Sequence, residues 1–171
     1  MVIGAFFNAV GDELLKIIVK ADKNNIKDLL NIDDSWDLKK YNKVKDILKN
    51  YNFDIDINKI DLYELKNILE RNREFLLRLL ENPILLEHED FTELLLAVFH
   101  LADELQKREN LDNLPKEDLE HLKNDILRVY KMLVIQWINY LIHLKENYPY
   151  LYSLCVRANP FNKKSVIIGK K

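Results

Sequence analysis

The sequence predicts an all-α fold: an antiparallel bundle of three long C-terminal helices on which shorter N-terminal helices pack. Two observations support this. The 171 residues include only 3 Gly and 4 Pro, too few turn residues for a many-stranded β architecture. In the second half of the chain, apolar side chains recur at steps of three and four residues, as in amphipathic helices. Because 48% of the residues are hydrophobic, we expect one domain with a single core over residues 1–171.

Residues 1–60 are expected to form a helical extension of this domain. A first helix is predicted from about Gly4 to Lys20, because its apolar residues fall on one stripe. A brief helix is expected within the polar stretch 21–34. Ser35 has the chemistry of an N-cap and is predicted to open a helix through about Lys49. That helix would bury the following side chains: Trp36, Leu38, Tyr41, Val44 and Leu48.

Residues 50–59 carry a different pattern, in which apolar and polar residues alternate around Phe53, Ile55 and Ile57. A period of two is typical of a strand. No second strand candidate is evident to pair with it, so an extended loop held by these three side chains is the favoured interpretation.

Residues 61–161 are predicted to form the core bundle. Asp61 with Glu64 has the spacing of a capping box and opens a helix that ends before Pro83. Asp90 with Glu93 repeats this spacing and is expected to open a second helix.

A third helix is expected to follow Pro115, which suits the first turn of a helix, and to be the most enclosed one. Pro149 interrupts it, and a short helix follows over residues 150–156. Residues 162–171 are left as a basic tail.

Charge and composition exclude several classes of function. The chain has 26 basic and 28 acidic side chains, so no bulk positive field draws it to nucleic acid. The single cysteine, Cys155, excludes a disulfide framework, and its hydrophobic neighbours indicate a buried structural thiol. There is no Gly-rich phosphate loop and no Gly-x-Ser-x-Gly elbow. We therefore predict a cytoplasmic protein that is not an enzyme and needs no cofactor.

One set of side chains has the chemistry of a metal site. His100 and Glu104 are four residues apart in one predicted helix, and His121 and Asp125 are four apart in the next. Residues at that spacing lie on the same helix face, so a mononuclear site from these four is geometrically conceivable. The alternative is that they form ordinary charge pairs on helix surfaces.

The C-terminus is rich in aromatic residues, and Tyr and Arg are concentrated at protein interfaces. The interface candidates are Tyr148, Tyr150, Tyr152, Arg157 and Phe161. The alternative is that these side chains cover the end of the bundle.

Several strings also resemble a known family. They include Arg73-Glu74-Phe75-Leu76-Leu77, Phe91-Thr92-Glu93-Leu94-Leu95 and Asn147-Tyr148-Pro149-Tyr150-Leu151. Together, over residues 63–161, they resemble the cytosolic C-terminal region of prokaryotic two-transmembrane potassium-channel family proteins. Nothing in the sequence matches the pore domain or its filter.

The resemblance implies a non-enzymatic helical module with a regulatory or protein-interaction role. Its partner would be protein, and the symmetry of a channel implies a homo-oligomer, either a dimer or a tetramer.

No apolar run reaches the length of a transmembrane helix. The segment Val2 to Val10 is about half that length and is interpreted as a packed first helix. The alternative is an interfacial anchor that acts together with the tail lysines, which would bring the chain into peripheral contact with a membrane. Those lysines are Lys163, Lys164, Lys170 and Lys171.

Overall fold

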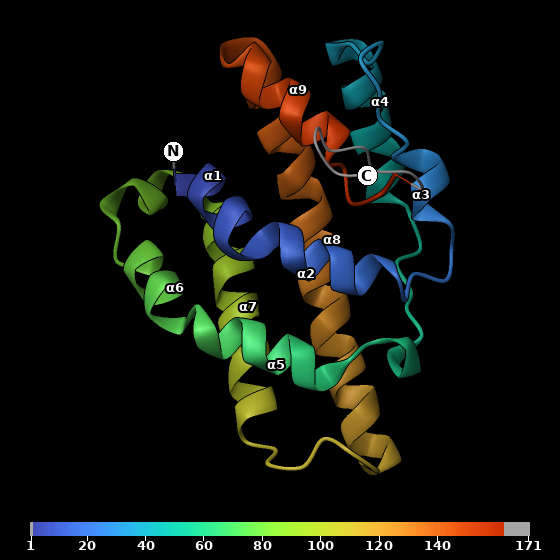
Figure 1. Ribbon diagram of the computed structural model, residues 1–171, viewed down its shortest axis with the longest axis vertical. Helices are drawn as coiled ribbons and strands as arrows, with labels where there is room; N and C mark the ends of the chain where they lie inside the picture. Colours follow the sequence, from blue (N-terminus) through green and yellow to red (C-terminus); the bar gives the residue numbers. More distant parts are fainter. Residues whose placement is uncertain (1, 163–171) are drawn as a thin grey trace, which may run out of the picture.

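The computed structural model describes residues 2–162 and is all-α over that range, with no strand (Figure 1). The two longest helices are α7 (Glu89–Gln106) and α8 (Lys116–Asn147), of 18 and 32 residues. They lie side by side and run antiparallel, joined by the loop 107–115 at the bottom of the view. At 1.5 Å per residue α8 is about 48 Å long, and the other helices pack along this hairpin. The prediction of an all-α fold is confirmed.

The predicted third long helix is instead two helices, α5 (Leu62–Arg71) and α6 (Arg73–Leu80). Asn72 lies between them with φ −103° and ψ 10°, and its side-chain amide donates to the carbonyl oxygen of Ile68 at 2.9 Å. This bond from an Asn side chain to the backbone one turn earlier competes with the helical pattern. The break turns α6 toward the start of α1, which it contacts.

The two predicted capping boxes have different outcomes. Asp61 caps α5, since its carboxylate accepts a hydrogen bond from the amide of Glu64 at 3.0 Å. The second prediction is wrong: α7 begins at Glu89 after the 3-10 turn η3 (Pro83–Glu87), so Asp90 lies inside the first turn. In that position its negative charge still stabilises the helix, because it lies near the positive end of the helix dipole.

The predicted first helix is present as three contiguous segments: α1 (Val2–Phe6), a π-helical turn η1 (Phe7–Gly11) and α2 (Asp12–Val19). Gly11 permits this turn to pack closely, because a Cβ atom there would lie 2.5 Å from the ring of Phe7. Phe6, Phe7 and Val10 are buried in the core. The N-terminal apolar segment is therefore a packed helix, as predicted, and peripheral contact with a membrane stays a prediction.

The next two helices are α3 (Ile26–Leu29) and α4 (Leu38–Lys49). Asp37, not Ser35, caps α4, because its carboxylate accepts from the amide of Lys40 at 2.8 Å. The predicted burial holds for Trp36, Tyr41, Val44 and Leu48, but Leu38 is exposed in the first turn of the helix.

The loop interpretation of residues 50–59 is confirmed. Ile55 is buried and forms an isolated antiparallel bridge with Asp22, and the 3-10 turn η2 (Ile57–Lys59) follows. Phe53 and Ile57 are partly buried against the core.

Hydrogen bonds join the N-terminal third to the C-terminal helices. The hydroxyl of Tyr130 in α8 donates to the carboxylate of Asp22 at 2.6 Å. The buried hydroxyls of Tyr41 and Tyr152, the latter in α9 (Pro149–Arg157), are 2.6 Å apart. In Figure 1, α2 crosses the hairpin while α4 and α9 flank the upper part of α8. Residues 1–60 therefore share one core with the bundle.

A partly buried carboxyl beside this core, that of Asp12, makes stability depend on pH. Burial raises the pKa of Asp12 from 3.8 to about 6, against the opposing charge of Lys16. An acid whose pKa is raised by folding destabilises the fold when ionised, so the destabilisation is absent below pH 4 and complete above about pH 7.

We therefore expect Asp12→Asn to stabilise the protein by up to about 3 kcal/mol at pH 8 and to have no effect near pH 3.5. Urea unfolding of both proteins across this range measures the difference. A constant difference at every pH would contradict the assignment.

Candidate metal centre

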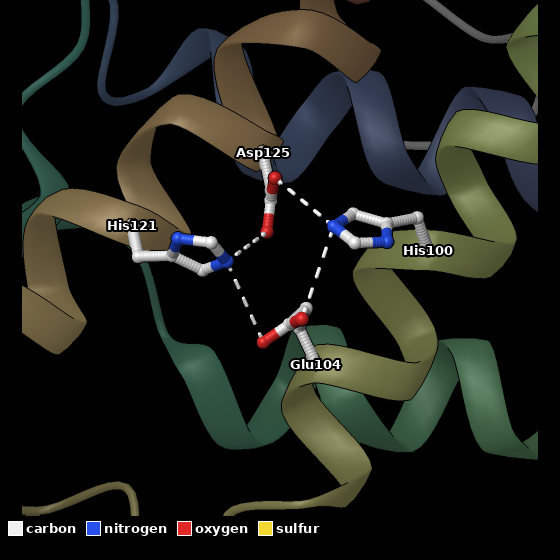
Figure 2. A group of neighbouring side chains, drawn as sticks. All are labelled: His100, Glu104, His121 and Asp125. Atoms are coloured by element: carbon white, nitrogen blue, oxygen red, sulfur yellow. Dashed lines mark ion pairs between the residues drawn. The ribbon is translucent and has the colours of Figure 1, made fainter.

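Four side chains from α7 and α8 converge at one place along the hairpin (Figure 2). His100 and Glu104 come from α7, and His121 and Asp125 come from α8, each pair one turn apart. One ligand atom from each residue lies within 4.8 Å of the others. The structure thus brings together all four residues that the sequence identified as metal candidates.

The packing of the hairpin explains why these side chains meet. Leu101 and Leu105 in α7, and Leu122 and Ile126 in α8, each follow a member of the cluster and are fully buried. They form the apolar seam between the two helices. The four polar residues precede them by one position and so lie along one edge of that seam.

The distances are close to those of a tetrahedral site. His100 Nε2 is 3.4 Å from Asp125 Oδ1, and His121 Nε2 is 3.5 Å from Asp125 Oδ2 and 3.6 Å from Glu104 Oε2. His100 Nε2 is 3.9 Å from Glu104 Oε1. Ligands at about 2.0–2.2 Å from Zn²⁺ in a tetrahedron are about 3.3–3.6 Å apart. These distances involve both oxygens of each carboxylate, and one atom from each residue lies within 4.8 Å of the others, so side-chain rotations that shorten the longer distances would complete such a site.

Burial within the cluster is uneven. Asp125 is only 3% exposed, whereas the side chains of His100 and His121 are 49% and 54% exposed. Asp125 Oδ2 is buried and has no hydrogen-bond partner among the described residues. A buried carboxylate oxygen without a donor is unfavourable, and a cation beside it would remove that cost.

Two arginines orient the carboxylates from outside the cluster. Arg108 donates to Glu104 Oε2 at 2.9 Å and to Asp118 at 3.1 Å, and Arg128 donates to Asp125 Oδ1 at 3.0 Å. The bond from Arg108 holds the pKa of Glu104 below its usual range. Outer partners of this kind fix ligand orientation in metal sites.

The sequence analysis did not identify these two arginines as part of the site. Helical spacing could have identified them, because Arg108 follows Glu104 by four residues and Arg128 follows Asp125 by three. Side chains at these spacings are neighbours on a helix and can form ion pairs.

The structure separates the five interface candidates. Tyr152 and Phe161 are buried, the latter stacked at a tilt on Trp137 with ring centroids 5.1 Å apart. Arg157 is half-buried and donates to the carbonyl oxygen of Ser153. Tyr148 and Tyr150 are exposed. A partner could contact these two tyrosines directly, and a dimer or tetramer stays a prediction.

The other features singled out in the sequence are placed as follows. Cys155 is half-buried, and burial raises the pKa of its thiol to about 11. The lysines of the basic tail lie outside the described residues. Within residues 2–162, no helix is long and apolar enough to cross a membrane.

Comparison with known proteins identifies one family. The family described as "Uncharacterized protein MJ1433, C-terminal helical domain" matches residues 1–157. The uncharacterized protein MJ1433 of Methanocaldococcus jannaschii is 71% identical over 168 residues, which are 98% of this chain and 68% of that protein. No solved structure matches.

These matches overturn the resemblance to a potassium-channel cytosolic region. Two of the strings that suggested it are short Leu-, Glu- and Phe-rich pieces of α6 and α7, and helical bundles of unrelated families carry the same patterns. The third, residues 147–151, spans the break between α8 and α9. The family match, by contrast, extends over both halves of the chain.

Proposed function

This chain belongs to the family of the uncharacterized protein MJ1433, as a C-terminal helical domain, and we propose that it binds one divalent transition-metal ion between α7 and α8. The ligands would be His100 Nε2, His121 Nε2 and one carboxylate oxygen each from Glu104 and Asp125. The observation that carries this proposal is the buried Oδ2 of Asp125, which accepts no hydrogen bond from the described residues and faces His121 Nε2 across 3.5 Å (Figure 2).

The ligand chemistry favours zinc or a neighbouring first-row metal. Two imidazole nitrogens with two carboxylate oxygens suit Zn²⁺, whereas Mg²⁺ and Ca²⁺ prefer oxygen ligands alone.

The role we propose is binding that joins the two central helices. Each helix supplies one imidazole and one carboxylate, so an ion would fasten α7 to α8 at four points. The half-exposed histidines give the ion a route in from solvent.

Isothermal titration calorimetry of the chelator-treated chain with Zn²⁺ tests the proposal. We expect one ion per chain, and at least about 100-fold weaker binding for His121→Ala, since loss of even an outer-shell partner often costs 10–100-fold. His143→Ala is the matched control, because His143 is exposed on α8 but lies outside the cluster, and it should bind zinc like the wild type.

Two results would contradict the proposal. One is the absence of stoichiometric binding. The other is equal loss in both histidine variants, which would mean that zinc binds surface imidazoles without a built site. The four residues would then be an ion-pair network.

A further inference from the structure

We propose that the ion bound by this cluster takes a small oxyanion, either a phosphate or a carboxylate group, as a further ligand, and that Arg128 binds a second oxygen of the same anion. This inference rests on the proposed function, because it names what the loaded site would bind. Three observations support it: the pairing of the carboxylates with arginines, the donors of Arg128 that remain available, and the exposure of the histidines.

Each carboxylate of the cluster uses one oxygen for an arginine and leaves the other for an ion. Asp125 Oδ1 accepts from Arg128 at 3.0 Å, while Asp125 Oδ2 has no donor among the described residues. Glu104 Oε2 accepts from Arg108 at 2.9 Å, while Glu104 Oε1 faces His100 Nε2 at 3.9 Å. The arginines therefore offset the charge of both carboxylates and leave one oxygen of each for an ion.

An ion bound here would leave its surroundings positively charged. Arg108 also pairs with Asp118, so the cluster and its paired residues contain three carboxylates and two guanidinium groups, with a formal charge of −1. Imidazole binds metals in its neutral form, so one divalent ion changes this total to +1. A bound cation is often the largest local charge in a site, and an anion beside it would restore neutrality.

Arg128 has donors available for such an anion. Among the described residues only Asp125 accepts from its guanidinium, and only from Nη1, which leaves Nε and Nη2 for a ligand. The Arg128 side chain is 51% exposed. The planar fork of an arginine matches the oxygens of a phosphate or a carboxylate.

Arg128 also lies close to the ligand atoms. His100 Nε2 is 3.4 Å from the same Asp125 oxygen that Arg128 contacts, so the guanidinium and this imidazole are neighbours. Arg108 is less suited to the role, because it is 17% exposed and already donates to both Glu104 and Asp118.

The exposed side of the cluster gives an anion access to the ion. Solvent reaches the half-exposed imidazoles of His100 and His121, and Zn²⁺ can accept a fifth ligand. Figure 2 shows these imidazoles on opposite sides of the gap between the two carboxylates. Two exposed carboxylates of α8 that would repel an anion, Glu117 and Glu120, lie at least two turns before Arg128.

Isothermal titration calorimetry with inorganic phosphate tests the inference. The chelator-treated chain is first titrated with Zn²⁺, and phosphate is then titrated into the zinc-loaded and the zinc-free chain. We expect one phosphate per zinc-loaded chain, and binding at least about tenfold weaker without zinc. Because coupling between two ligands is reciprocal, saturating phosphate should tighten zinc binding by the same factor.

Acetate is the second probe and distinguishes the source of the oxyanion. Tighter binding of phosphate than of acetate would identify a phosphate group as the ligand, and the reverse order would identify a carboxylate.

Arg128→Gln should weaken phosphate binding by the zinc-loaded chain at least about tenfold and should still bind one zinc ion. Arg128→Lys keeps the positive charge beside Asp125 but loses the planar fork, so its affinity for phosphate should lie between those of Arg128→Gln and the wild type. Lys131→Gln is the matched control, because it removes the same charge from an exposed side chain of α8 one turn further on, outside the cluster. It should bind phosphate like the wild type.

Failure of this inference and failure of the proposed function give different results. Absence of stoichiometric zinc binding contradicts the proposed function before any anion is added. Zinc binding with equal phosphate affinity in the loaded and zinc-free chains would overturn this inference alone. Equal loss of phosphate binding in Arg128→Gln and Lys131→Gln would also overturn it, because the anion would then respond only to the overall charge of the helix.

Discussion

Replacing Asp22 with alanine is expected to lower the free energy of unfolding by about 3–5 kcal/mol. The Asp22 carboxylate accepts hydrogen bonds from the hydroxyls of Tyr130 and Tyr51, at 2.6 and 3.2 Å, and from the amide of Asn24, at 2.8 Å. Tyr130 is fully buried, and burial raises the pKa of its hydroxyl above the ordinary value. Alanine would leave that hydroxyl buried without an acceptor.

Urea unfolding at neutral pH measures the effect. Asp22→Asn keeps one acceptor oxygen and should cost less than Asp22→Ala. Asp46→Ala is the control, because Asp46 makes only an exposed ion pair with Lys49 and should change stability by less than about 0.5 kcal/mol. A decrease of under 1 kcal/mol in the free energy of unfolding for Asp22→Ala would show that this hydrogen-bond network does not stabilise the packing of the N-terminal third against α8.

Zinc is expected to raise the melting temperature of the chelator-treated chain. At a free zinc concentration 1,000 times Kd, binding to the folded state alone adds about 4.1 kcal/mol. For a chain of this size, each kcal/mol raises Tm by about 2–4 °C, so the expected rise is about 8–16 °C. Differential scanning calorimetry with and without zinc measures it.

Asp125→Asn should abolish this rise, because an amide is a poor ligand and one negative charge is lost. In the absence of metal the same variant should melt at or slightly below the wild type, because the amide keeps an oxygen that accepts from Arg128 but loses the ion pairs with the half-exposed His100 and His121. Asp103→Asn, a carboxylate on α7 outside the cluster, should keep the whole rise. An equal rise in all three proteins would exclude this site as the source.

Residue spacing predicted some features of the fold correctly and missed others. Asp61 was identified correctly because a cap depends on one turn of chain. Ser35 and Asp37 are both able to cap and lie two residues apart, so local pattern could not separate them. The break at Asn72 depends on a hydrogen bond from its side chain to the backbone of its own helix. The spacing of apolar residues gives no information about such a bond.

The candidate site shows the same division. The two pairs, His100 with Glu104 and His121 with Asp125, were visible as helical spacing. Whether they face each other depends on the register between α7 and α8. That register depends on how the buried seam residues of the two helices interdigitate, and on the loop 107–115, where Leu111 is buried and its amide donates to the hydroxyl of Tyr63.

The hydrogen bond from Tyr130 to Asp22 joins residues 108 positions apart, and the one between Tyr41 and Tyr152 joins residues 111 positions apart. The hairpin of α7 and α8 closes only a short loop and can fold quickly, whereas docking of the N-terminal third must wait for a loop of over 100 residues. The entropic cost of closing a loop rises only about 0.6 kcal/mol per doubling of its length. These long-range contacts therefore slow folding more than they lower the stability of the fold. Partial unfolding would accordingly release residues 1–60 first and uncover the apolar side of α8, while the hairpin and its four converging side chains stay in place.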